Sequence, residues 1–155
     1  MGDGFQICSL IENGGLFYDV EGSSPQEVYK NIVESFTLPD YLNKEELLEE
    51  LLTREKILST AVGSGIAIPH PRRPMMQNDQ DQKIFVCFLK NSLDMNAPDA
   101  RKVFVMFFVL SSSSKTHLDV LSSLAKAIKY TEFKQILQTR PSAKDLIEAF
   151  KKYSK

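Results

Sequence analysis

The stretch VFVMFFVL, residues 103–110, is apolar at every position and rich in β-branched and aromatic side chains. A second stretch of the same kind, IFVCFL, occupies residues 84–89. Continuous apolarity over such short runs is typical of a strand covered on both faces, because a strand with one solvated face alternates apolar and polar residues. Both runs are also far shorter than the ~20 residues that an apolar helix needs to cross a bilayer. They predict the central strands of a sheet.

Helical patterns alternate with short strand patterns around these two runs. Ser24 as N-cap, Pro25 at the first helical position and Glu27 closing a capping box predict the start of one helix. Asn43 and Glu46 repeat the device before a leucine-rich stretch. The other predicted elements are strands over 16–20 and 66–68 and helices over 117–128, 131–138 and 142–153. This interleaving predicts an α/β fold with a mixed β-sheet and helices on both faces, a three-layer α/β/α single domain over residues 1–155.

Two finer expectations concern a helix face and a loop. In the helix over 117–128, the residues at helical spacing that predict the buried stripe are Leu118, Leu121, Ala125 and Ile128. The stretch RRPMMQNDQDQ, residues 72–82, is polar and has no periodicity, and it is the segment that we expect to be most mobile.

The composition narrows the class of protein. A chain of 155 residues fits one domain and can bury a core without disulfides or metal. A net charge of −1 offers no basic surface, so neither direct nucleic-acid binding nor membrane insertion is expected. Cys8 and Cys87 are isolated, and the amino terminus lacks a signal-peptide pattern, which together favour the cytoplasm. The alternative that the chain is one domain of a longer regulator stays open.

His70 lies between two prolines in the sequence GSGIAIPHPRRP, residues 63–74. Proline restricts the residue before it to extended conformations, so His70 is held at the end of the short strand. Gly63 and Gly65, just upstream, allow the chain to turn sharply and to approach another group closely. The end of a strand beside such a turn is where α/β proteins usually place their chemistry.

The chemistry of imidazole makes His70 a candidate nucleophile. Because imidazole titrates near neutrality, a neutral ring nitrogen can attack without a separate base. A phosphoryl group taken up there would need cations and hydrogen-bond donors around its charge. The sequence offers Arg54, Arg72 and Arg73 for this purpose, together with the helix start near His117.

Other readings of the same residues are weaker. His117 taken alone has the pattern of a surface residue. The two histidines and two cysteines are scattered rather than paired as zinc ligands usually are, so no metal is expected. The sequence GSG lacks the lysine and hydroxyl of a phosphate-binding P-loop, and no cofactor is expected.

The stretch LLTREKILSTAVGSGIAIPH, residues 51–70, resembles the signature of enzyme IIA domains of the bacterial phosphoenolpyruvate-dependent phosphotransferase system. The class is that of mannitol and fructose, which includes the nitrogen-regulatory branch, and the similarity extends over residues 16–150. The resemblance implies that His70 is a phosphoryl acceptor forming a tele-phosphohistidine. It also implies that Arg54 and His117 are active-site residues and that the phosphocarrier protein HPr is the donor.

Along the same motif we expect four residues to bind at the site: Thr60, Gly63, Gly65 and Arg72. The chain departs from the family pattern after the active histidine, where a small residue is common and Pro71 stands here, followed by Arg72 and Arg73. One hypothesis is that these arginines steer an acidic partner.

Two functions fit the resemblance. In the first, the protein is a regulator of the nitrogen-regulatory type, whose phosphorylation state changes which target protein it binds, and the wording of the motif favours this branch. In the alternative, it is a sugar-transport component that passes phosphate from His70 to a IIB domain of a fructose- or mannitol-type transporter. A binding module without phosphotransfer is a third reading, against which the presence of Arg54, His70 and His117 together argues.

Overall fold

Five strands form one mixed sheet in the computed structural model, which describes residues 4–154. In chain order they are β1 (Gly15–Val20), β2 (Ala61–Gly63), β3 (Ile66–Ala67), β4 (Lys83–Leu93) and β5 (Val103–Leu110). Across the sheet the order is β1-β4-β5-β3-β2. The pairs β1/β4 and β3/β5 are parallel, whereas β4/β5 and β2/β3 are antiparallel. The predicted mixed sheet is confirmed.

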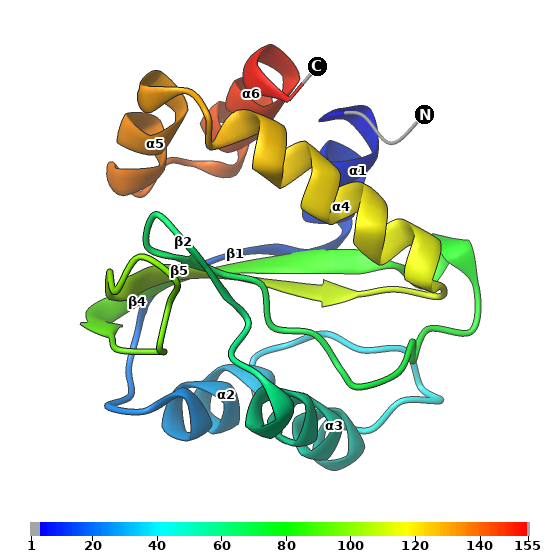
Figure 1. Ribbon diagram of the computed structural model, residues 1–155. Coiled ribbons are helices and arrows are strands. Elements are labelled where there is room, and N and C mark those ends of the chain that lie inside the picture. The colour runs from blue at the N-terminus through cyan, green and yellow to red at the C-terminus, as the bar shows by residue number, and fades with distance from the viewer. Residues whose placement is uncertain (1–3, 155) are drawn as a thin grey trace.

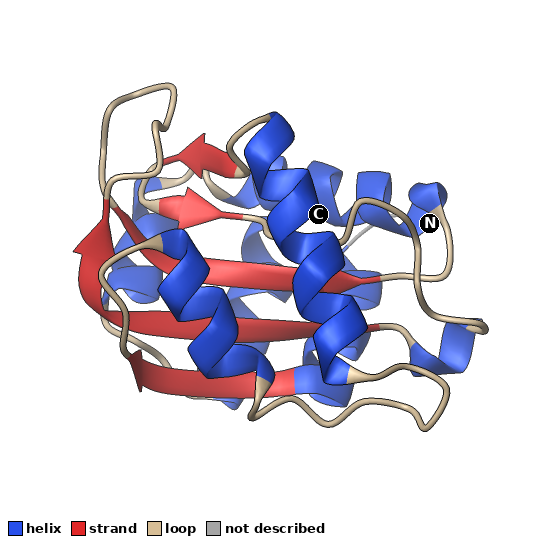
Figure 2. Cartoon of the chain, turned by 90° about the horizontal axis from the view of Figure 1, so that it is seen from below, coloured by secondary structure: helices blue, strands red, loops and turns tan. Residues whose placement is uncertain are grey.

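Helices cover both faces of this sheet (Figure 1). One face carries α2 (Pro25–Val33) and α3 (Lys44–Ile57). The other carries α1 (Gly4–Gly14), α4 (Ser114–Ala127), α5 (Thr131–Gln138) and α6 (Ala143–Tyr153). Figure 2, seen from the side of α2 and α3, shows the strands lying side by side behind those helices. None of the helices within residues 4–154 is long and apolar enough to cross a membrane.

Side chains of the two central strands, β4 and β5, pack into two separate hydrophobic cores, one on each face of the sheet. In β4, Phe85 and Cys87 join the cluster under α2 and α3, while Ile84 and Val86 join the cluster under the other helices. The strand β5 alternates in the same way between the two clusters. Residues 84–89 of β4 and 105–110 of β5 are buried on one side or the other, and these runs are therefore continuously apolar rather than alternating.

The predicted helix starts are confirmed at the side-chain level. Ser24 caps α2 by accepting from the N–H of Glu27 at 3.2 Å, and Asn43 caps α3 by accepting from the N–H of Glu46 at 2.7 Å. The capping box differs in one detail, because the Glu27 carboxylate accepts from the N–H of Ser23 at 2.9 Å, one residue before the N-cap.

The predicted buried stripe of the fourth helix is wrong. The helix α4 begins at Ser114 with Ser113 as N-cap, so His117 lies inside its first turn. Leu118 is 62% exposed and Ala125 is exposed, while Leu121 and Ile128 are only partly buried. The buried residues are Thr116, Val120, Ser123, Leu124 and Ala127. Three of these five side chains are small or carry a hydroxyl group, so a pattern of apolar residues does not identify them as core.

Two further elements depart from the sequence pattern. The helix α1, for which the sequence analysis made no prediction, packs on β4 with Ile7 and Ile11 fully buried. The segment 72–82 is held by specific contacts, since Met75 and Met76 are buried and the Met76 N–H donates to the carbonyl of Ser111 at 3.1 Å. These contacts anchor the polar segment to the body of the domain.

We predict that Gly65→Ala lowers the free energy of unfolding by about 2–4 kcal/mol, measured by urea denaturation. Gly65 has a φ of +81°, and an added Cβ would lie 2.5 Å from the ring of Phe104. Gly15→Ala is the matched control, because Gly15 has a φ of +123° but nothing within 4 Å of an added Cβ. The control therefore adds strain without a clash and should cost only about 1–2 kcal/mol. Equal losses in the two variants would contradict the packing role of Gly65.

Candidate active site

The backbone on either side of His70 is fixed by two neighbouring strands. The N–H of Ile68 donates to the carbonyl of Thr60 at 2.9 Å, which extends the pairing of β2 with β3. The N–H of Val109 in β5 donates to the carbonyl of Pro69 at 3.0 Å. His70 therefore begins the loop at the carboxyl end of β3, as the flanking prolines predict.

One hydrogen bond determines which nitrogen of the His70 ring carries the hydrogen. The ring Nδ1 lies 2.9 Å from the carbonyl oxygen of Ile68. A carbonyl can only accept, so Nδ1 carries the hydrogen and Nε2 keeps its lone pair. Burial lowers the pKa of His70, which favours the neutral ring near pH 7 although the Ile68 hydrogen bond opposes the shift. The lone pair of the neutral ring is therefore on Nε2, where it is available to an electrophile.

His117 lies directly against His70. The centroids of the two rings are 4.1 Å apart, and the ring planes meet at 42°. Burial lowers the pKa of His117 to about 4, and the charges of His70 and Arg54 add to the shift. Its Nδ1 is buried and has no hydrogen-bond partner among the described residues. A buried polar atom without a partner is uncommon in folded proteins, and it marks His117 as a candidate functional residue.

A cavity of about 160 Å³ opens beside the two rings. Its lining residues are His70, His117, Arg72, Arg73, Pro71, Pro74, Ser111, Ser114 and Val109. The volume is several times the roughly 30 Å³ of one water molecule, so a small anionic group has room there. The charged groups in this lining are guanidiniums, and Ser114 brings the amino-terminal turn of α4 to the cavity. The site is suited to an anion.

Arg54 acts on the site through its charge. It lies in the last turn of α3, where Nη1 donates to the carbonyl of Leu58 at 2.6 Å. Its charge lowers the pKa of both His70 and His117. The structure thus brings together His70, His117, Arg54 and Arg72 from the predicted set.

A buried network missed by the sequence analysis supports the strand that leads to His70. The carboxylate of Glu55 accepts from the Tyr29 hydroxyl at 2.6 Å, the Thr60 hydroxyl at 2.8 Å and the Thr60 N–H at 3.0 Å. Thr60 in turn accepts from Ile68, whose carbonyl holds His70. In the sequence, only its position next to Arg54 in the motif of residues 51–70 pointed to Glu55.

Gly63 and Gly65 lie at the other end of β3 from His70. They flank Ser64 in the hairpin turn between β2 and β3, where Ser64 has a φ of +57°. The N–H of Ser64 donates to Asp99 at 2.8 Å, and Gly65 packs against Phe104. The structure places both glycines outside the lining of the cavity, and their binding role stays a prediction.

We predict that the stability of the protein falls as the pH is lowered from about 6.5 to about 4 and that His117→Gln reduces this fall. In that window the unfolded chain binds a proton at His117 that the folded chain does not, so acid favours unfolding. Urea denaturation at a series of pH values measures the slope, and an NMR titration of the imidazole signals gives the pKa directly. A His117 pKa at or above 6.5 in the folded protein would contradict the burial argument.

Comparisons with known proteins agree with this geometry. The family model described as "Phosphoenolpyruvate-dependent sugar phosphotransferase system, EIIA 2" matches residues 9–153. A nitrogen regulatory protein of Pseudomonas aeruginosa is 28% identical over 147 residues, which cover 92% of this chain and 93% of that protein. The fructose-specific EIIABC component of Bacillus subtilis is 24% identical over 153 residues, which cover 97% of this chain and 24% of that longer protein.

A solved structure has the same fold. The crystal structure of the nitrogen regulatory protein IIA-Ntr from Neisseria meningitidis matches with a TM-score of 0.74 at 25% identity, covering 92% of this chain and 94% of that one. With the family model matching nearly the whole chain, the chain belongs to the type-2 enzyme IIA family of the phosphoenolpyruvate-dependent sugar phosphotransferase system, and it is a phosphocarrier component of that system.

Proposed function

We propose that this protein is a regulator of the nitrogen-regulatory type, which accepts a phosphoryl group on Nε2 of His70 from the phosphocarrier protein HPr in the cytoplasm. The observation that carries the proposal is the 2.9 Å hydrogen bond between His70 Nδ1 and the Ile68 carbonyl. It leaves Nε2 free to form a tele-phosphohistidine beside an anion-sized cavity. The similarity to a nitrogen regulatory protein over 93% of that protein's length supports the regulatory branch.

The transfer is an exchange between two nitrogen–phosphorus bonds. The bond between phosphorus and the donor's ring nitrogen breaks, and its electron pair returns to the donor ring, which carries a proton on its other nitrogen and therefore leaves as neutral imidazole. A bond forms between phosphorus and His70 Nε2. The His70 ring then carries positive charge, and its Nδ1–H continues to donate to Ile68, which disperses that charge. Because the two bonds are of one kind, the protein mainly supplies positioning and charge stabilisation.

The other residues have distinct parts in this proposal. Arg54 offsets negative charge on the transferring group, and neutral His117 donates a hydrogen bond to a phosphoryl oxygen. Arg72 binds the phosphoryl group from the cavity lining. Thr60 acts through Ile68 and thereby holds the His70 ring in place.

The transport function remains the second candidate, because the fructose-specific relative contains a segment that aligns with 97% of this chain. In that case a IIB domain of a fructose- or mannitol-type transporter accepts the phosphoryl group. Incubating the phosphorylated protein with such a IIB domain and following the label separates the two roles, since a pure regulator keeps its phosphoryl group.

We predict a single acid-labile phosphoryl adduct on the wild-type protein after incubation with phosphoenolpyruvate, enzyme I and HPr, and none on His70→Gln. Intact-mass measurement detects the adduct, and circular dichroism checks that the variant is folded. An adduct that persists on the variant would assign the acceptor to another residue. An unlabelled wild type, with HPr phosphorylated in the same tube, would reject the proposed function.

We predict that Arg54→Gln slows phosphoryl uptake by about 10²–10³-fold, because removing a preorganised cationic donor has effects of this size. Lys56→Gln is the matched control, since Lys56 is an exposed cation in the same helical turn. Rapid-quench kinetics with phosphorylated HPr gives both rates. Equal rates in the two variants would remove Arg54 from the mechanism.

A further inference from the structure

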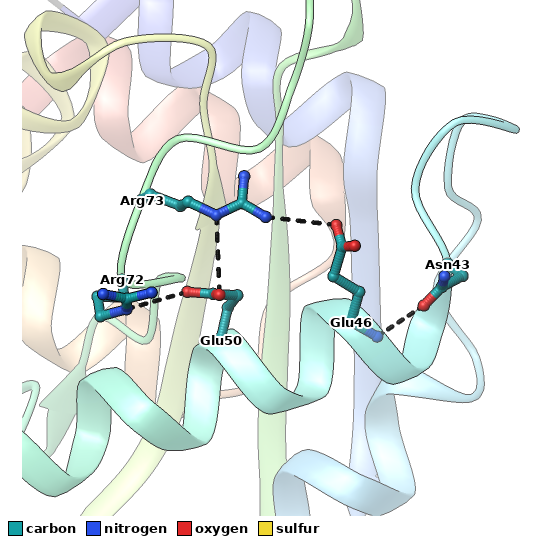
Figure 3. Close-up of polar contacts among 5 residues, drawn as sticks. All are labelled: Asn43, Glu46, Glu50, Arg72 and Arg73. Carbon is teal, nitrogen blue, oxygen red and sulfur yellow. Dashed lines mark hydrogen bonds and ion pairs between the residues drawn. The ribbon is translucent and has the colours of Figure 1, made fainter.

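Two arginines of the active-site cavity are paired with carboxylates outside it. Arg72 Nε lies 3.3 Å from Glu50 Oε1, and Arg73 Nε lies 3.7 Å from Glu50 Oε2. Arg73 Nη2 also lies 3.5 Å from Glu46 Oε1. Figure 3 shows both guanidiniums reaching from the loop to the same helix, α3, with Glu50 between them. The same two arginines line the cavity beside His70.

The backbone that carries the two arginines is held by prolines and a hydrogen bond, while their side chains are about half exposed to solvent. Pro71 and Pro74 restrict the chain on either side, and the N–H of Arg72 donates to the carbonyl of Glu50 at 3.3 Å. The side chains of Arg72 and Arg73 are 55% and 52% exposed, whereas that of Glu50 is 15% exposed. Because water solvates the guanidinium side of each pair, the attraction is weakened there, and the guanidiniums can change partner by side-chain rotation.

A phosphoryl group on His70 is the stronger partner. It brings about −1.5 to −2 charges and three acceptor oxygens, whereas each carboxylate brings a single charge. Guanidinium groups pair with phosphoryl oxygens in the same two-pronged way as with carboxylates. We propose that phosphorylation of His70 moves Arg72 and Arg73 from Glu50 and Glu46 to the phosphoryl group, so that Glu50 competes with the phosphoryl group for both arginines.

This exchange rests on the proposed function, and it makes Glu50 a positioning residue that sets the affinity for phosphate through the arginines. The phosphorylated form also presents Glu46 and Glu50 without their cations. The charge on the outer face of α3 therefore changes by more than the phosphoryl group itself contributes.

The test is the equilibrium of phosphoryl transfer between HPr and the protein, measured by intact mass. We expect Glu50→Gln to shift this equilibrium toward the phosphorylated protein by about two- to fivefold, as the loss of competing ion pairs whose arginines are solvated predicts. Glu49→Gln is the matched control, because it removes the same charge from the neighbouring exposed position, which has no ion pair among the described residues. Glutamate and glutamine have similar helix propensities, so both variants retain α3.

A double-mutant cycle separates competition from simple repulsion between carboxylate and phosphate. In an Arg72→Gln, Arg73→Gln background, Glu50→Gln should leave the equilibrium unchanged. A shift that persists in that background, a shift toward HPr, or equal effects of Glu50→Gln and Glu49→Gln would each overturn the exchange.

A second measurement distinguishes failure of the exchange from failure of the proposed donor. Phosphoramidate, a small phosphoryl donor that needs no docking surface, is used to label His70, and the arginine Nε–H signals are followed by NMR. We expect the Arg72 and Arg73 signals to move on labelling, and unmoved signals overturn the exchange. Labelling by phosphoramidate but not by HPr rejects the donor while the arginine signals still decide the exchange. No label from either source overturns both proposals.

Discussion

The antiparallel pairing of β4 with β5 is the constraint on which the other elements depend. Side chains from this pair enter two cores, one under α2 and α3 and the other under the remaining helices. Since neither face can meet water, both helical layers are required, and β3 joins the sheet only by pairing with β5. The hydrogen bond from the Val109 N–H to the Pro69 carbonyl then fixes the backbone next to His70 relative to β5. The position of the His70 ring thus depends on the pairing of the buried strand β5 with the segment that follows β3.

The electrostatics of the site follow from how its charges are partnered. The Glu55 carboxylate accepts three hydrogen bonds from Tyr29 and Thr60, so it supports the strand. Burial keeps both histidine rings neutral by lowering the pKa of each. Arg54, Arg72 and Arg73 bring positive charge to the neighbourhood of the neutral His70 ring, and Glu46 and Glu50 partly offset the charge of Arg72 and Arg73. A neutral ring with cationic surroundings attracts an anionic phosphoryl group without losing its lone pair to a proton.

Signals that are local in the sequence predicted most of the fold. The caps at Ser24 and Asn43 and the two apolar strands are read from a few adjacent residues, and the structure confirms them. The prediction of the buried face of α4 failed because Ser123 and Ala127 are buried without being strongly apolar. In the site, the motif pointed to His70 and Arg54. The hydrogen bond from Tyr29 to Glu55 and the ion pairs of the two arginines with Glu50, by contrast, join segments that are far apart in the chain. No local pattern encodes such contacts.

The residues after His70 give this chain a property that its motif does not specify. Pro71 and Pro74 hold a pair of arginines at the cavity, and the carboxylates of Glu46 and Glu50 on α3 hold their side chains. A phosphocarrier must release its phosphoryl group as well as accept it, so a site that bound the group too tightly would stop turnover. Two guanidiniums without carboxylate partners would bind the phosphoryl group more tightly. Carboxylates that share those guanidiniums weaken the hold by a small amount, which keeps the phosphorylated and free forms close in free energy and the transfer reversible.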